Sequence, residues 1–120
     1  MQRDMDLIRK MLMDLEDGGN RAWEGRDRKD PEHAARVKYH AFVLVDAGYA
    51  QGVDVTGLGS AHPESELTSL TWAGHEFLDA ARDEGRWKQA KALGAGVGGM
   101  AVSVLKELLV SLAKKQLGLP

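Results

Sequence analysis

The spacing of apolar residues along this 120-residue chain changes in the middle, and that change limits the folds that the chain can adopt. In residues 4–16, 31–47 and 100–117, apolar side chains recur every three or four positions, as on a helix with one buried face. Between residues 49 and 72 the period becomes two, which is typical of strands. We therefore expect a mainly α-helical fold with one small β-hairpin.

The segment of period two predicts both strands of this hairpin and the turn between them. Its larger apolar residues alternate with small or polar ones, as on a half-buried strand: Tyr49, Val53 and Val55 against Ala50, Gly52 and Asp54. TGLGSAHPESE forms a turn-rich tip, and LTSLTW is expected as the returning strand.

Residues with special backbone preferences mark the ends of the first two helices. Asp4 is suited to cap the first helix, and Gly18 to stop it. Asp30 followed by Pro31 is a strong start for the second helix, because proline has no N–H to lose at the first helical position. Gly48 is expected to end that helix in the left-handed conformation.

The C-terminal part is expected to be helical and to contain one glycine-rich break. Thr71 can cap a helix over residues 73–83, and a short helical piece follows at 87–93. The break GAGVGG then leads into the last helix. We expect residues 1–93 to form one winged-helix-like domain, and residues 94–120 to form the break and an amphipathic helix packed on it or on a second subunit.

The last helix carries the broadest apolar stripe of the chain. This stripe can cover the first helix as part of the intramolecular core, or it can form the seam of a homodimer. Its members are Val102, Leu105, Leu108, Leu109 and Leu112.

Positive charge is distributed unevenly. Of the 16 Lys and Arg residues, nine lie in residues 1–38 and seven from Arg82 onward, so residues 41–81 contain none. Six acids fall in that cation-free segment: Asp46, Asp54, Glu64, Glu66, Glu76 and Asp79. The predicted hairpin is therefore purely acidic.

The composition indicates an intracellular protein. The chain has no cysteine, which favours a reducing compartment over secretion. No apolar run approaches the roughly 18 to 20 residues that cross a bilayer, and MQRDMDLIRK has acids where a signal peptide needs an apolar stretch. We expect a cytoplasmic protein without membrane contact.

The expected order of elements is helix, short strand near residues 21–24, helix, two-stranded wing, helix and helix, which is the order of winged-helix domains. HAARVKYHAFVLVDAGYAQG resembles the recognition-helix segment of bacterial winged-helix regulators, and LTWAGHEFLDAARDEGRW resembles their second wing strand and following helix. More specifically, RDMDLIRKML, LTWAGHEFLDAARDE and LKELLVSLAKKQLGL resemble an uncharacterised domain-of-unknown-function family of phages and prophages.

This resemblance covers nearly the whole chain and implies a winged-helix fold and a bacterial, mobile-element setting, but no activity. The chain departs from the regulators at two places. Ala41 and Phe42 follow His40 where the regulators place leucine and usually a polar residue, and the turn at residues 48–50 is Gly-Tyr-Ala where they have Gly-Leu-Ile.

The first functional hypothesis is binding of double-stranded DNA by helix 31–47 in the major groove. Arg36 and His40 would face base edges, and Lys38 would flank the helix against the backbone. Phosphates would be held by the cations just before the helix. The residues of this hypothesis are Arg26, Arg28, Lys29, Arg36, Lys38 and His40.

The second hypothesis is a module or inhibitor that binds a host protein of the defence or transcription machinery. Trp23, Tyr39 and Phe42, together with the acidic wing, would offer an aromatic and charged surface of the kind that anchors interfaces. Ordinary packing is the alternative role for Trp23 and Phe42.

No pattern predicts catalysis, a cofactor, a metal site or a small-molecule substrate. His33 and His40 share one helical face and His62 and Glu64 form H-x-E, but zinc requires three or four ligands. GAGVGG lacks the preceding strand and the βαβ unit of a dinucleotide fingerprint. Ser60 near His62 has no third partner. We expect a protein that is not an enzyme.

Overall fold

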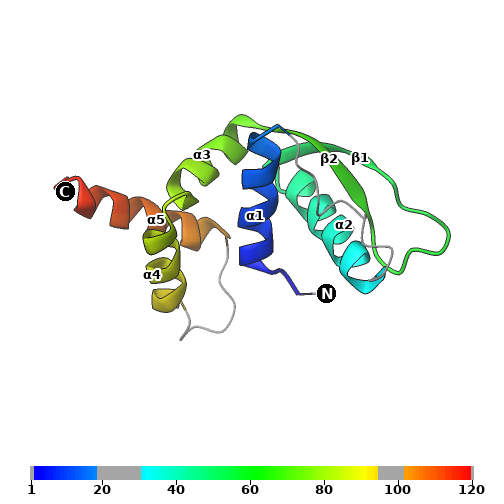
Figure 1. The fold of residues 1–120 in the computed structure, drawn as a ribbon, viewed down its shortest axis with the longest axis horizontal. Helices are drawn as coiled ribbons and strands as arrows, with labels where there is room; N and C mark the ends of the chain where they lie inside the picture. The colour runs from blue at the N-terminus through cyan, green and yellow to red at the C-terminus, as the bar shows by residue number, and fades with distance from the viewer. Residues whose placement is uncertain (1, 19–30, 95–101, 120) are drawn as a thin grey trace. The chain divides into compact units, whose positions relative to one another are not determined.

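The computed structural model describes residues 2–18, 31–94 and 102–119 (Figure 1). It confirms a mainly helical chain with one antiparallel two-stranded hairpin. In these ranges, no helix is long and apolar enough to span a membrane. The elements are α1 (Met5–Glu16), α2 (Pro31–Asp46), β1 (Ala50–Asp54), β2 (Ser65–Leu70), α3 (Trp72–Ala81), α4 (Glu84–Gly94) and α5 (Val102–Gln116).

The chain packs as two compact units, Met1–His75 and Glu76–Pro120. The first contains α1, α2 and the hairpin, the second contains α4 and α5, and α3 runs from one into the other. The expected division into a domain of residues 1–93 and a C-terminal segment of residues 94–120 stays a prediction.

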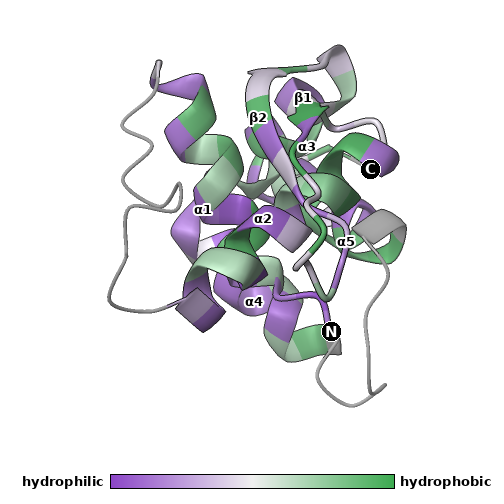
Figure 2. Ribbon diagram, turned by 90° about the vertical axis from the view of Figure 1, so that its right-hand side faces the viewer, coloured by the Kyte–Doolittle hydropathy of each residue, from purple (hydrophilic) through white to green (hydrophobic). Residues whose placement is uncertain are grey.

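The core of the first unit is built by α1 and α2 against the hairpin. α2 packs on both strands, and α1 packs on α2 and β2. Both helices carry hydrophilic as well as hydrophobic stretches, as expected for helices with one buried side (Figure 2). The buried apolar residues are Ile8, Met11, Leu12, Leu15, Val37, Ala41, Leu44, Ala50 and Leu67.

The predicted helix ends of this unit are confirmed where the structure describes them. The carboxylate of Asp4 accepts a hydrogen bond from the N–H of Leu7 at 3.2 Å, which caps α1. Gly18 follows the last turn of α1 with φ +84°, and Gly48 follows α2 with φ +83°. Asp30 lies outside the described residues.

The first strand buries the small Ala50 and exposes its valines, the reverse of what the alternation in sequence predicts. Ala50 is buried, whereas Val53 and Val55 are exposed. The reason is the close packing of α2 on β1. A Cβ added at Gly52 would lie 2.5 Å from the carbonyl oxygen of Glu66 and 3.1 Å from Cγ2 of Val45, so the side of β1 that faces α2 has no room for large residues.

Thr71 and Gly74 join the hairpin to α2 and α3. The Thr71 hydroxyl accepts a hydrogen bond from the N–H of Gly74 at 3.1 Å, which confirms the predicted cap, and donates one to the carbonyl of Gly48. A Cβ at Gly74 would lie 2.0 Å from the carbonyl oxygen of Tyr49. The glycine of the LTWAG sequence at residues 70–74 therefore has a structural reason, because only glycine permits this close approach of α3 to the chain before β1.

The second unit packs α4 against α5. Phe77 and Trp87 meet edge to face, with ring centroids 6.4 Å apart. The guanidinium of Arg86 donates to Oε1 of Gln116 at 2.9 Å. The buried apolar residues of this unit are Phe77, Leu78, Ala81, Trp87, Ala90, Leu105, Leu109 and Leu112.

The stripe of the last helix belongs to this core. Leu105 and Leu109 are fully buried and Leu112 is buried within the single chain, in the unit where α5 packs on α4. The side chain of Val102 lies outside the described residues. Homodimerisation itself stays a prediction.

Candidate functional site

The start of α1 is attached to α2 through His40. The backbone N–H of Asp4 donates to Nε2 of His40 at 2.9 Å, and the other ring nitrogen, Nδ1, lies 2.8 Å from the carbonyl oxygen of Arg36. Because Nε2 accepts a hydrogen bond, the ring proton must be on Nδ1, where it is donated to Arg36. A neutral imidazole with this tautomer satisfies both backbone groups.

The surroundings of His40 keep it neutral. Burial lowers the pKa of His40, because the charged form loses its hydration, and the positive charge of Arg36 lowers it further. The hydrogen bond to the Arg36 carbonyl and the charge of Asp4 act in the opposite direction. The net direction is downward, so the ring is held in the form that the hydrogen bonds require.

The prediction that His40 faces base edges is wrong, since its side chain is fully buried against α1. Arg36 remains at the surface, with 44% of its side chain exposed, and its guanidinium forms an ion pair with Asp4 at 2.7 Å. The face of α2 that carries Arg36 and His40 therefore contacts the start of α1. Lys38 lies half-buried on the same helix.

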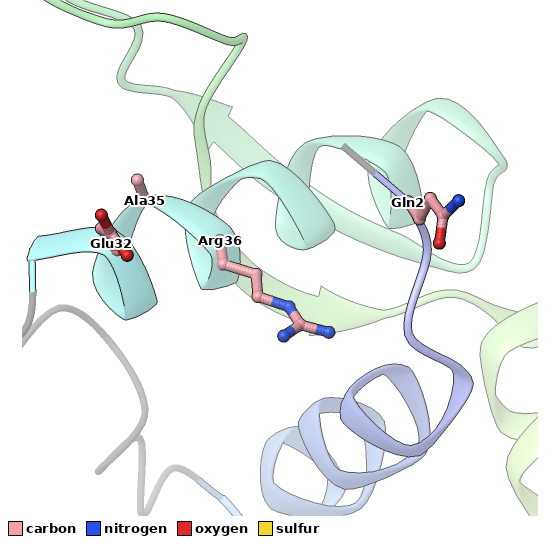
Figure 3. Close-up of a pocket in the computed structure, with 4 residues that line it drawn as sticks. All are labelled: Gln2, Glu32, Ala35 and Arg36. Carbon is pink, nitrogen blue, oxygen red and sulfur yellow. The ribbon is translucent and has the colours of Figure 1, made fainter.

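An open hollow of about 570 Å³ lies beside Arg36. It is lined by Gln2, Glu32, Ala35 and Arg36, and Figure 3 shows Gln2 coming from the segment before α1 and the other three from α2. A carboxylate and a guanidinium thus line the same hollow. This mixture of charges does not favour a phosphate over other ligands.

Of the two aromatic residues predicted for the surface of α2, Tyr39 contacts the hairpin loop. The Tyr39 ring is stacked with Phe42, with centroids 6.4 Å apart, and lies 5.4 Å from the ring of His62. Both Tyr39 and Phe42 are half-buried. The loop between the strands therefore lies against α2 at Tyr39, and the role of Phe42 stays a prediction.

Polar contacts order the loop from within. The N–H of Thr56 donates to Asp54 at 2.8 Å, and the N–H of Glu64 donates to the Thr56 hydroxyl at 3.0 Å. Hydrogen bonding to Thr56 lowers the pKa of Asp54. Ser60 accepts from the N–H of Gly57 at 3.0 Å and donates to the carboxylate of Glu64. The loop thus carries its own network of hydrogen bonds on both sides of the tip.

Three apolar side chains project from this ordered hairpin. Val53 and Val55 lie on the outer side of β1 with 52% and 37% of their surface exposed, and Leu58 at the tip is fully exposed. Glu66 lies directly across from Val53 on β2 and is also exposed. We call the set Val53, Val55, Leu58, Asp54, Glu64 and Glu66 the hairpin surface.

The electrostatic character of the first unit is negative. Its described residues, 2–18 and 31–75, include five Lys or Arg and ten Asp or Glu. No cation lies between residues 41 and 81, so none belongs to the hairpin. Glu66 makes no ion pair with any residue that the structure describes. The hairpin surface is therefore apolar and acidic.

The sequence hypotheses missed the exposure of Val53, Val55 and Leu58, and that of Trp72, which is also largely exposed. Leu58 had a signal, since an apolar residue between Gly57 and Gly59 has no regular element to bury it. The expected site residues Trp23, Arg26, Arg28 and Lys29 lie outside the described residues.

Comparison with known proteins gives a family but no activity. Residues 2–100 match the family model described as Hypothetical protein (DUF2513). The chain is also similar to an "Uncharacterized protein" of Haemophilus influenzae (strain ATCC 51907 / DSM 11121 / KW20 / Rd), with 35% identity over 95 residues that cover 76% of each chain. No solved structure matches.

Proposed function

We propose that this chain, which belongs to the DUF2513 family of hypothetical proteins, is a protein-interaction module that binds a partner protein through its hairpin surface. The observation that supports this proposal best is the full exposure of Leu58 at the tip of a loop that is closed by internal hydrogen bonds. A hairpin that presents leucine and valine to solvent is typical of a surface that another protein covers.

The charge of the same surface supports a protein partner over duplex DNA. Phosphates attract Lys and Arg and repel carboxylates, and phosphate contacts supply most non-specific affinity for DNA. The hairpin has Asp54, Glu64 and Glu66 and no cation. His40, which the DNA hypothesis needs in the groove, is buried.

A winged-helix architecture and a phage or prophage setting belong to this proposal. The order of α1, α2, the hairpin and α3 supports the former, because winged-helix domains place a hairpin directly after their recognition helix. In such a setting the partner would be a protein of the bacterial host cell.

DNA binding is the second candidate, because one sequence feature favours it. Residues 21–29 contain four Lys or Arg, among them Arg26, Arg28 and Lys29. With Arg36 and Lys38, these residues could hold phosphates without any contribution from the hairpin.

One set of variants separates the two candidates. Leu58→Ser combined with Val53→Thr removes apolar surface from the hairpin, a triple change of Arg26, Arg28 and Lys29 to Ala removes the basic segment, and Glu107→Lys on α5 serves as the control. We expect immobilised wild type and control to capture the same bacterial protein, and the hairpin variant to lose it. The captured protein, once purified, should bind the wild type directly in calorimetry.

Duplex DNA is titrated in parallel at about 50 and about 200 mM salt. We expect the wild type to bind DNA no more tightly than the triple alanine variant. Binding that weakens steeply with salt and disappears in the triple variant would establish the DNA-binding candidate in place of the protein-interaction module.

A further inference from the structure

The outer edge of β1 is not paired with any strand that the structure describes. In residues 2–18, 31–94 and 102–119, the sheet consists of β1 and β2 alone. Just beyond the two ends of β1, the N–H of Val55 donates to the carbonyl of Glu64, and the carbonyl of Tyr49 accepts from the N–H of Thr71, so the backbone groups of Tyr49 and Val55 point toward the chain of β2. Backbone groups alternate in direction along a strand. Gly52 and Asp54 therefore direct their N–H and C=O groups away from β2, toward the unpaired edge.

This edge lacks most features that prevent strand addition. Natural edge strands are usually protected by lysine, proline or a bulge. The sequence of β1 is AQGVD, with no lysine or proline, and the register shift between Gln51 and Gly52 places the extra residue, Thr68, on β2. Asp54 is the one charged residue of the strand. A segment that pairs with this edge must be compatible with that carboxylate.

The outer side of β1 defines which side chains a pairing segment needs. Val53 is exposed on this side, and so is Val55 just beyond the end of β1. Glu66 lies directly across from Val53 on β2 and makes no ion pair with a described residue. A lysine or arginine next to Val53 on an added strand would lay its aliphatic part on the valine and carry its charge toward Glu66. The attraction between this cation and the carboxylate of Glu66, one strand further along the sheet, would favour a basic segment over an acidic one.

We propose that a basic, extended segment of the partner protein adds to β1 as a third strand. Its backbone bonds Gly52 and Asp54, and its Lys or Arg side chains cross Val53 toward Glu66. This inference rests on the proposed function and specifies the partner, since backbone pairing gives affinity while the alternating side chains give specificity. An acidic or helical partner segment does not fit this edge.

The test uses a labelled nine-residue peptide of alternating lysine and valine as the probe, with fluorescence anisotropy as the readout. We expect binding in the micromolar range, and no binding of the same peptide with glutamate in place of lysine. Two further peptides carry N-methyl groups on one or the other alternating set of amides. Strand addition uses one edge of the peptide, so one methylated peptide should bind at least about tenfold more weakly and the other should bind unchanged.

Variants of the protein locate the site. Glu66→Lys should weaken binding at least about tenfold by replacing the carboxylate that the peptide's lysines approach with a cation, whereas Glu107→Lys, the same change on α5, should not. In the wild type, hydrogen exchange at the amides of Gly52 and Asp54 should slow at least about tenfold on saturation with the peptide.

The outcomes distinguish this inference from the proposed function. Peptide binding without protection of Gly52 and Asp54, or with equal affinity for both methylated peptides, overturns strand addition. Failure of every basic peptide, while the captured partner still depends on Leu58, also overturns it but leaves the protein-interaction module intact. Loss of the captured partner in the control variant as much as in the hairpin variant defeats the proposed function itself.

Discussion

The backbone N–H of Asp4 donates to Nε2 of His40 at 2.9 Å, so a fully buried imidazole holds the first turn of α1 against the middle of α2. The two residues are 36 positions apart in the chain. This hydrogen bond requires that Nε2 of His40 carries no proton. Protonation of His40 breaks the hydrogen bond, so the stability of the first unit should depend on pH.

We predict that the unfolding free energy decreases as the pH falls below about 6.5. Burial lowers the pKa of His40 in the folded chain, so the unfolded chain binds this proton at a higher pH than the folded chain does. Between the two pKa values unfolding takes up a proton, and acid therefore favours it. Urea titrations between pH 8 and pH 5 measure the slope.

His40→Gln should flatten this dependence and cost about 1–3 kcal/mol at pH 8, because a buried hydrogen-bonding partner is changed. His33→Gln, an exposed histidine two turns earlier on the same helix, is the matched control and should keep the wild-type slope. An equal slope in wild type and His40→Gln would show that another group is responsible.

Asp4 combines a helix cap with an ion pair, and the cap should dominate its contribution to stability. Asp4→Ala removes both and should cost about 1–2 kcal/mol. Asp4→Asn keeps an oxygen for the N–H of Leu7 and breaks only the pair with Arg36, which is partly exposed, so the loss should stay below about 1 kcal/mol. Thermal unfolding compares the two. Equal losses would mean that the ion pair carries the effect.

Gly74→Ala should destabilise the chain by more than about 2 kcal/mol, although alanine is the better helix former. Its Cβ would lie 2.0 Å from the carbonyl oxygen of Tyr49, and backbone on both sides of this contact would have to move. Gly59→Ala, where nothing lies within 4 Å of the added Cβ, should be neutral in the same urea titration. A neutral Gly74→Ala would show that α3 does not approach Tyr49 this closely.

Leu109→Ala should cost about 2–5 kcal/mol, because the side chain is fully buried and its removal leaves a cavity. Val110→Ala, one position along α5 and 37% exposed, should cost less than about 1 kcal/mol. Leu109→Glu should unfold the second unit. If it instead gave a folded protein of half the wild-type mass in light scattering, Leu109 would belong to a dimer seam.

Local chemistry explains which parts of the fold the sequence could predict. The caps at Asp4 and Thr71 and the left-handed Gly48 depend on neighbours within a few residues, and all three are confirmed. The later helices also form where their periodicity indicates, with ends shifted by a few residues. For example, α4 begins at Glu84, where residue 87 was expected.

Tertiary contacts explain the errors. The outward direction of Val53 depends on how closely α2 approaches β1, and the burial of His40 depends on where α1 begins. Neither can be predicted from residue spacing. The spacing does not show which side of a short strand is buried, or which of the two histidines, His33 and His40, is covered by another helix. The candidate site was therefore predicted in its acidic character but not in its apolar residues.

The Thr71 hydroxyl donates to the carbonyl of Gly48 and at the same time accepts from the N–H of Gly74. The beginning of α3 therefore depends on closure of the hairpin. If the strands separate, the first turn of α3 loses its cap in the same event. Hairpin opening and fraying of that turn should therefore occur as one cooperative step within an otherwise intact molecule.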